Sequence, residues 1–364
     1  MKKIFIYAVS AVLAFASCEK TAGDAGELTI HVDKTQIESD GKDMAVFTIK
    51  DAAGNVVSTE ANLPTIFYKN VSDGTRLPRY SKGFTSIADG RYEFKGILNG
   101  VETSNSVVVN SVNRADYEVF HKNVAVFKLT GTWCTNCPRM TTALHSLGDD
   151  AAGHSIVLAC HHEEIKDHPF NVYYDGTTLG MAFFIYMGMD SYSFPMNCYD
   201  MVEMDSSSST VTITDIIMER RIESPATVGA KVSSFALDGT TLKVNASVKA
   251  SQAGTYDMVC VLLADDLFYE GGYTDNEEGL YSNVVLAVSG SNFMRYTSDT
   301  CFELDADGER SSVFEFPFDS VPSEDLLKKM RVVILVHKKG SDGSSHVNNC
   351  VECAYGSSVD YKYN

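Results

Sequence analysis

The hydrophobic periodicity of this chain changes twice, and these changes limit the folds open to it. Residues 27–111 contain short apolar–polar alternations, such as ELTIHVDK and GRYEFKGIL, separated by turn signals such as SDGKD and AAGN. Residues 112–225 mix strand-length apolar runs with runs of helical spacing, and residues 226–364 return to strand patterns. A two-residue period predicts half-buried strands, and a 3.6-residue period predicts helices. We therefore predict an α+β multidomain protein with an N-terminal β-sandwich, a central α/β domain and a C-terminal β-sandwich.

The central region predicts three strands, each followed by a helix. The predicted strands are VAVFKLTG, SIVLACHH and SFPMNCYDMV, and the predicted helices are CPRMTTALHSLG, TTLGMAFFIYMG and TITDIIMERRIES. The last of these, residues 212–224, is expected to be capped near Thr214. Between residues 226 and 364 the patterns are strand-like except for SEDLLKKM, residues 323–330, which predicts one short helix.

The N-terminus has the pattern of a secretory signal. Lys2 and Lys3 precede an apolar run over residues 4–16, which is too short to cross a bilayer as a permanent helix. Small residues at positions 16 and 17 come immediately before Cys18. We therefore expect residues 1–17 to be a signal peptide and residues 18–26 to be a tether.

The residues around Cys18 resemble the lipobox of bacterial lipoproteins, which implies that this cysteine becomes the acylated first residue of the mature protein. Phe15 departs from the leucine that the family prefers at that place. An ordinary signal peptide cut after Ala16 or Ser17 is the alternative. Because no later segment is long and apolar enough to span a membrane, we expect the acyl group to be the only membrane attachment, in the cell envelope and at the outer membrane.

A formal charge of −18 argues against nucleic acid as a partner.

The segment KLTGTWCTNCPRM, residues 128–140, contains the chain's only tryptophan, Trp133, followed by Cys134 and Cys137. A strand, a short turn and then a helix that begins near this pair bring the two sulfurs to one face, within disulfide range. The free N–H groups and positive dipole end of the helix favour a thiolate on the first cysteine. We also expect Cys134 to be exposed enough to attack and Cys137, one turn further in, to be more buried. Pro138 is tolerated in the first helical turn. The pattern predicts a redox-active dithiol, with a static disulfide as the alternative.

GTWCTNCP resembles the W-C-x-x-C motif of thioredoxin-like proteins, and SFP at 193–195 falls where that fold has its cis-proline. With the signal, the lipobox and the β-rich tail, most of residues 113–364 resembles the outer-membrane protein twenty-eight family of thioredoxin-like lipoproteins. Residues 27–111 resemble bacterial immunoglobulin-like domains, with a spacer role. The resemblance implies a thioredoxin-like α/β domain over residues 112–225 and a second β-sandwich over 226–364.

The resemblance also implies roles for individual residues. Cys134 would be the nucleophile, Cys137 the resolving thiol and Pro195 the cis-proline, with substrate lying against Trp133 and Phe194. The expected partners are thiols or disulfides of envelope proteins, and no cofactor or metal is expected. Thr135 and Asn136 replace the Gly-Pro of thioredoxin, and no buried Asp or Lys can be assigned from the sequence as a proton relay for the second cysteine.

Metal sites are the weaker alternative for the cysteines and histidines. Cys350 and Cys353 would lie three apart in a strand and so point to opposite faces, which suits chelation poorly. The segment CHHEEIKDH contains four further potential ligands, Cys160, His161, His162 and His168, of which the adjacent histidines also point apart.

The remaining cysteines are expected to be structural. Cys160 and Cys198 would lie in strands on either side of a central strand and remain free thiols. If all four are bridged, three disulfide pairings are possible, and the sequence does not choose between them; the four are Cys260, Cys301, Cys350 and Cys353.

Two functions therefore remain open. The first is a membrane-anchored thiol–disulfide oxidoreductase that acts through the dithiol. The second is a surface-binding or assembly lipoprotein in which the thioredoxin-like unit is only a scaffold. The sequence leaves open whether the protein is an enzyme.

Overall fold

In the computed structural model, the described residues are 27–39, 43–59, 62–68, 83–86, 90–112, 120–274, 279–289, 293–294, 300–340 and 345–363. The expected signal peptide, the tether and Cys18 lie outside these ranges. Within them, no helix is both long enough and apolar enough to cross a membrane.

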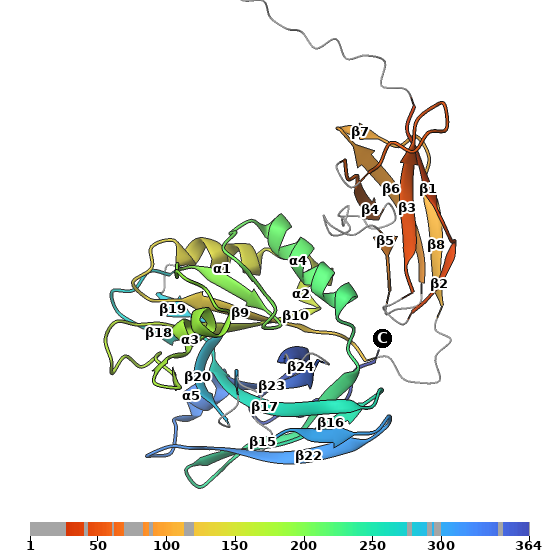
Figure 1. Cartoon of the computed structure of the whole chain (residues 1–364). Helices are drawn as coiled ribbons and strands as arrows, with labels where there is room; N and C mark the ends of the chain where they lie inside the picture. Colours follow the sequence, from red (N-terminus) through yellow and green to blue (C-terminus); the bar gives the residue numbers. More distant parts are fainter. Residues whose placement is uncertain are drawn as a thin grey trace, which may run out of the picture.

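The first eight strands form two sheets around a common apolar core, drawn at the upper right of Figure 1. One sheet has the order β1-β3-β5, and the other has the order β2-β8-β6-β4 with β7 paired to β6. Their bounds are β1 Thr29–Val32, β2 Gln36–Glu38, β3 Ala45–Lys50, β4 Thr65–Tyr68, β5 Gly83–Phe84, β6 Gly90–Leu98, β7 Val101–Glu102 and β8 Val107–Val112. The ring of Phe94 lies at the centre of this core, 4.8 Å from the rings of Phe47 and Phe84.

The rest of the chain is built on one nine-stranded mixed sheet. Its order is β14-β13-β9-β10-β20-β17-β23-β24, with β21 paired to β17. The bounds are β9 Val124–Thr130, β10 Ser155–His161, β13 Met196–Tyr199, β14 Glu203–Asp205, β17 Gly254–Ala264, β20 Val284–Val288, β21 Phe302–Leu304, β23 Met330–Lys339 and β24 Ser345–Ala354. Strands β9 and β10 are parallel, and β13 is antiparallel to β9.

This sheet corrects the predicted fold class. The expected α+β arrangement, with a separate central α/β domain and a separate C-terminal sandwich, is wrong: the chain is mostly β, and strands from both regions share one sheet. The link is the parallel pairing of β10 with β20, at Ala159 and Val284. The physical reason lies in strands such as β17, whose residues Tyr256–Ala264 are all buried. A strand covered on both faces and paired on both edges belongs inside a large sheet.

Helices cover both faces of the part of the sheet around β9 (Figure 1). On one face lie α1 Cys137–His145, α2 Asp149–Ala152 and α4 Thr210–Glu223, and on the other lies α3 Leu179–Tyr186. Met140, Ile213 and Ile217 pack against β9 on the first face, and the ring of Phe183 lies 4.7 Å from that of Phe127 on the second.

A second, three-stranded sheet with the order β15-β16-β22 covers β17 and β23. The bounds are β15 Val228–Asp238, β16 Thr241–Ala250 and β22 Glu309–Pro317. The short remaining elements are β11 Tyr173–Tyr174, β12 Thr177–Thr178, β18 Leu267–Phe268, β19 Leu280–Tyr281 and α5 Glu324–Lys329.

A buried ion pair holds the start of β9. Lys122 Nζ lies 2.8 Å from Asp200 Oδ2 and also donates to the backbone carbonyl of Asn348, 2.7 Å away. The other carboxylate oxygen of Asp200 accepts the N–H of Ala125 at 2.9 Å. Because neither charged side chain is exposed, losing one partner would leave a buried charge unpaired, so this contact fixes the strand that leads into the dithiol.

Candidate dithiol site

The two cysteines of the CxxC motif form a disulfide just beyond the end of β9. Their Cα atoms are 5.4 Å apart, in agreement with the geometry expected from the sequence. Helix α1 begins at Cys137, with Pro138 in its first turn, so Cys134 lies in the preceding turn rather than at the helix start. The N–H of Cys137 donates to the carbonyl of Cys134 at 3.3 Å, which closes that turn.

The two cysteines do not differ in exposure as expected. The sequence suggested an exposed Cys134 and a more buried Cys137, but the exposed fractions are 4% and 3%. The expected difference is therefore wrong for the oxidised form. Trp133, the residue immediately before Cys134, has an exposed fraction of 44%.

The side chain of Trp133 is held close to the backbone at Gly131 and His162. Its indole N–H donates to the carbonyl of His162 at 2.9 Å. A Cβ atom on Gly131 would lie 2.6 Å from the indole nitrogen and 2.8 Å from that same carbonyl, so only glycine fits there. The glycine of the sequence TGTWC is thus needed to place the tryptophan beside the disulfide.

Trp133, the residue before Cys134, forms one aromatic surface with Phe194. The Phe194–Pro195 peptide bond is cis, which confirms the prediction made for it. The ring of Phe194 lies 5.6 Å from that of Trp133, 5.7 Å from that of His162 and 5.4 Å from that of Phe184. The structure therefore brings together the residues that the sequence suggested for substrate binding.

A buried carboxylate holds the turn before the cysteines. Glu163 accepts hydrogen bonds from the N–H and the hydroxyl of Thr132, both at 2.7 Å, and contacts His161 Nδ1 at 2.8 Å. Burial would raise the pKa of Glu163, but the bonds from His161 and Thr132 outweigh it and lower that pKa. Burial lowers the pKa of His161, an effect that Glu163 only partly opposes.

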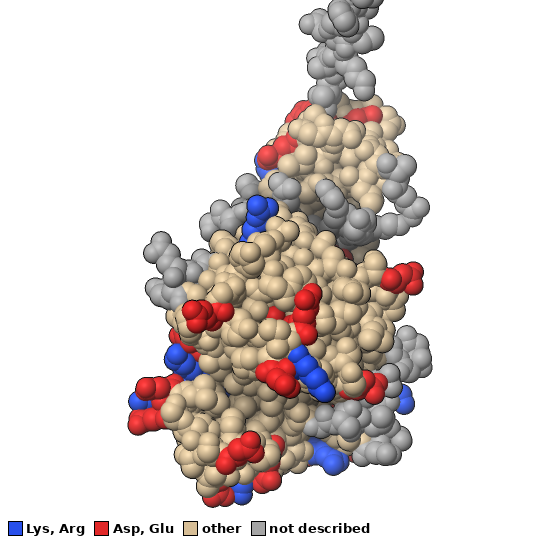
Figure 2. All heavy atoms as spheres, turned by 90° about the vertical axis from the view of Figure 1, so that its left-hand side faces the viewer, with Lys and Arg blue, Asp and Glu red and all other residues tan. Residues whose placement is uncertain are grey.

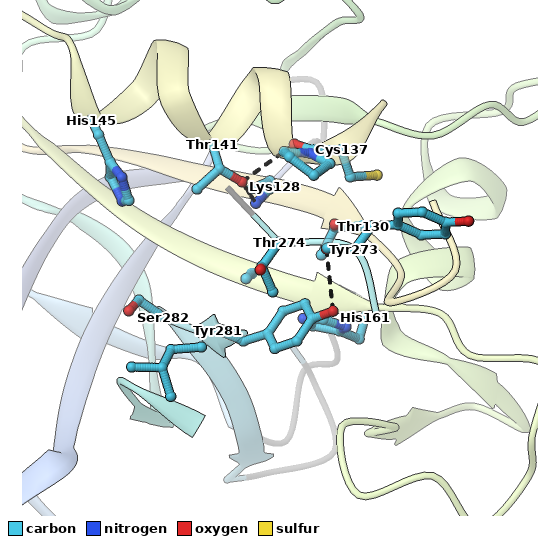
Figure 3. A pocket seen from close by; sticks show the side chains of 13 residues that line it. Lys128, Thr130, Cys137, Thr141, His145, His161, Tyr273, Thr274, Tyr281 and Ser282 are labelled. Carbon is cyan, nitrogen blue, oxygen red and sulfur yellow. Dashed lines mark hydrogen bonds between the residues drawn. The ribbon is translucent and has the colours of Figure 1, made fainter. Parts of the chain in front are cut away.

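A cavity of about 30 Å³ lies beneath α1, with Cys137 in its lining. Figure 3 shows Lys128 and Thr141 near Cys137, and His145 with Ser282 at the far end. Lys128 comes from β9, is buried, and donates from Nζ to the hydroxyl of Thr141. The cavity is large enough to hold a water molecule. Because Lys128 and Thr141 line it together with Cys137, this cysteine has polar, cationic surroundings on the side of the cavity.

Lys128 and Glu163 are site residues that the sequence analysis did not assign. Lys128 is the one charged residue in the apolar run VAVFKLT, six positions before Cys134. A lysine in a strand buried on both faces is a signal that could have been used. Glu163 belongs to CHHEEIKDH, a segment in which only the cysteine and the histidines stand out from the sequence, as potential metal ligands.

The residues considered as metal ligands have other contacts or point apart. Cys350 packs into the core that contains α3, and Cys353 packs into the core under the second sheet, so the two lie on opposite faces of β24. His161 contacts Glu163, and His162 Nδ1 lies 2.7 Å from the Thr178 hydroxyl. Within the described ranges, no group of three or more His, Cys, Asp or Glu side chains is arranged to hold a metal ion.

The other strand cysteines are buried. Cys160 in β10 and Cys198 in β13 flank β9 and are free thiols, as expected. Burial raises the pKa of both thiols. The free, buried thiols outside the CxxC motif are Cys160, Cys198, Cys260, Cys350 and Cys353. Their burial and raised pKa values make them poor nucleophiles.

No protein-family model matches this chain, and no curated protein matches it. Among solved structures, HBP35 of Porphyromonas gingivalis is similar with a TM-score of 0.51 and 16% identity, over 65% of this chain and 76% of that chain. A structural-genomics target from Agrobacterium tumefaciens has a TM-score of 0.42 and 14% identity, over 65% of this chain and 95% of its own. The first likeness shows a shared fold alone, and the second is too weak to support an inference. Neither establishes the family that the sequence resembles.

Proposed function

We propose that this protein is a thiol–disulfide oxidoreductase of the bacterial cell envelope, anchored by an acyl group on Cys18. The observation that supports this most is the Cys134–Cys137 disulfide, which lies at the N-terminus of α1 and follows Trp133, whose ring contacts that of Phe194. An acyl anchor would hold the dithiol among envelope proteins whose cysteines are its partners. No cofactor is needed for the exchange.

The reaction is a two-step exchange. In the reduced protein, the Cys134 thiolate attacks one sulfur of a partner disulfide, and the other partner sulfur leaves as a thiolate with the electron pair. The Cys137 thiolate then attacks the Cys134 sulfur, which forms the protein disulfide and releases the second partner thiolate. The two released thiolates take up two protons, so the partner is reduced and the protein oxidised. The same steps run in reverse when a partner dithiol reduces the disulfide.

The partner would lie along the segment before Pro195. Among the described residues, the backbone N–H and carbonyl of Phe194 make no hydrogen bond within the chain. An extended partner segment can pair with these groups while an apolar side chain packs on Trp133 and Phe194. The substrate class is therefore a cysteine-containing polypeptide in an extended conformation.

Burial of both cysteines favours a second candidate function. Exposed fractions of 4% and 3% also suit a static disulfide in a binding or assembly lipoprotein. In that case the dithiol would not exchange with partners, and binding would be carried by the β-rich remainder of the chain.

Trapping of mixed disulfides with partner proteins distinguishes the two candidate functions. In the native envelope, Cys137→Ala should accumulate reductant-sensitive adducts through Cys134, because the resolving thiol is missing. Cys134→Ala and the double variant serve as matched controls and should show none. If no variant forms adducts, and iodoacetamide labels reduced Cys134 no faster at pH 6 than a free cysteine peptide, the disulfide is static.

A further inference from the structure

The nine-stranded sheet has a gap beside β10. Strand β10 pairs with β9 along its whole length, from Ser155 to His161. On its other side it pairs with β20 at Ala159 alone. Among the described residues, the first half of β10 therefore has no neighbouring strand on that side, although β10 lies inside the sheet order rather than at its end.

The hydrogen bonds of β10 show which backbone groups face the gap. The carbonyl of His154 accepts from Val124 at 2.8 Å, so the even-numbered residues of β10 bond toward β9. The N–H of Ala159 donates to Asn283 at 2.7 Å, on the opposite side. By this alternation Ser155 and Val157 present their N–H and carbonyl groups to the gap, and among the described residues these groups have no partner there. Such an edge is a template for an added strand.

The gap opens into a groove of about 650 Å³. Leu144, Leu147 and Ile156 supply apolar lining on the side of α1 and β10, and Ala354 contributes from β24. A strand of four residues is about 13 Å long, and its alternate side chains would point toward α1 or toward the rim. The groove thus provides an unpaired strand edge and apolar contacts, both of which strand addition requires.

The rim of the groove is acidic. Asp265, Asp266 and Glu352 line it together with one basic side chain, Arg331. That guanidinium is already engaged, because its Nε lies 2.9 Å from Asp265 Oδ2 and its Nη1 lies 2.5 Å from Glu352 Oε2. Lys329, outside the lining, donates to the backbone carbonyl of Asp266 at 2.8 Å. Three carboxylates against one guanidinium favour an occupant with positive side chains. Figure 2 shows acidic and basic side chains interspersed over one face of the molecule, with the acidic ones more numerous.

We propose that this groove binds an extended, basic polypeptide segment of a partner protein, which adds to β10 as a strand. Alternate residues of the segment are apolar and pack toward Leu144 and Leu147, and the intervening lysines or arginines reach Asp266 and Glu352. This site is distinct from the exchange reaction: it needs neither cysteine. It would give the protein a second means of holding a partner.

The test uses the mature protein and a fluorescein-labelled peptide of sequence Lys-Val-Lys-Val-Lys-Val, followed by fluorescence anisotropy. Two variants of this peptide, the methylated twin and the Glu twin, separate the contribution of backbone hydrogen bonds from that of charge. One has alternate backbone nitrogens methylated, which keeps the charge but blocks strand pairing, and the other has Glu in place of Lys. We expect saturable binding of the first peptide and at least about tenfold weaker binding of both twins, a difference of the size that one or two lost backbone bonds or ion pairs produce.

Protein variants locate the binding. Asp266→Asn and Glu352→Gln should each weaken binding of the Lys peptide about threefold or more, while Asp319→Asn, an exposed carboxylate outside the groove lining, should not. A Cys134→Ala, Cys137→Ala double variant should bind as the wild type does, whether or not the protein is an oxidoreductase. Equal binding of the methylated twin or of the Glu twin, or no saturable binding at 1 mM peptide, would overturn the proposal. So would a concentration-dependent dimer that the Lys peptide dissociates, because the occupant would then be a second copy.

Discussion

Glu163 holds Thr132 by two hydrogen bonds, one to its backbone N–H and one to its hydroxyl, both 2.7 Å long. Thr132 comes two residues before Cys134, so this buried carboxylate fixes the turn that carries the dithiol. The two residues are 31 positions apart in the sequence. The contact joins the ends of β9 and β10, which lie side by side in the parallel pair.

Replacing Glu163 by Gln should destabilise the protein by about 2 kcal/mol, because hydrogen bonds to a charged group contribute about 1.5–3 kcal/mol and the amide can accept only part of them. Urea unfolding measures this change. Glu164→Gln, at the exposed neighbouring position, is the matched control and should leave the midpoint unchanged. Equal midpoints for the two variants would show that the carboxylate does not hold the turn.

Replacing Lys128 by Met should make the dithiol less reactive. The buried ammonium favours a nearby thiolate, so its removal should raise the pKa of the reduced cysteines. We expect the rate of iodoacetamide labelling at pH 6 to fall severalfold, measured on the reduced protein. Lys166→Met removes an exposed lysine and should have no effect. An unchanged rate for Lys128→Met would mean that the cavity does not influence the thiols.

Phe194→Ala should impair exchange with protein disulfides more than with small ones. The aromatic surface would contact only a polypeptide substrate, so we expect about a tenfold loss in kcat/KM for insulin reduction and little change with a small disulfide. Phe268→Ala, which removes an aromatic side chain of 66% exposure elsewhere, is the control. Equal losses with both substrate classes would indicate a damaged dithiol rather than a lost binding surface.

The local features of the site could be predicted from the sequence, because they depend on residues close together in the chain. The strand before Cys134, the helix after it and the disulfide geometry follow from the continuous segment 124–148. The cis bond before Pro195 was predicted from the family resemblance, and the structure confirms it. The start of α4 was misplaced, because the cap is Ser209, whose hydroxyl accepts from Thr212, and not Thr214.

The large sheet could not be predicted from the sequence. The alternation of apolar and polar residues indicates which residues form a strand, but it does not indicate which strand pairs with it. Ala159 pairs with Val284, at a separation of well over a hundred residues, and that pairing joins two regions that composition and periodicity had divided. Glu163 was missed for the same reason: its role depends on Thr132, which only the parallel pairing of β9 and β10 brings near.

Stability should fall as the pH drops below about 6.5. Burial lowers the pKa of His154, His337 and His346 to about 4, whereas the unfolded chain titrates near the ordinary value of 6.5. Between these values the unfolded state binds more protons, so acid favours unfolding. The lowered pKa of Glu163 adds to the loss below its ordinary value of 4.5.

A single histidine substitution tests the origin of this acid sensitivity. His337 is buried, its Nε2 has no hydrogen-bond partner among the described residues, and its Nδ1 lies 3.4 Å from the Ser345 hydroxyl. His337→Met should therefore keep most of the stability at pH 7 and flatten the loss between pH 6.5 and 4, measured by urea unfolding at each pH. His31→Gln, at an exposed position, should leave the slope unchanged. A slope for His337→Met equal to that of the wild type would contradict this account.

The membrane anchor is the last prediction. Cys18 follows a basic start, an apolar run and two small residues, and within the described ranges no helix can cross a membrane. An acyl group on this cysteine would attach the protein to a membrane. Radiolabelled palmitate should enter the wild type and the Cys134→Ala, Cys137→Ala double variant, but not Cys18→Ala, and only the last should appear in the soluble fraction of the envelope. The double variant separates acylation at Cys18 from labelling of the reactive dithiol. Equal labelling of Cys18→Ala and the wild type would contradict the anchor and favour an ordinary signal peptide cut after Ala16 or Ser17.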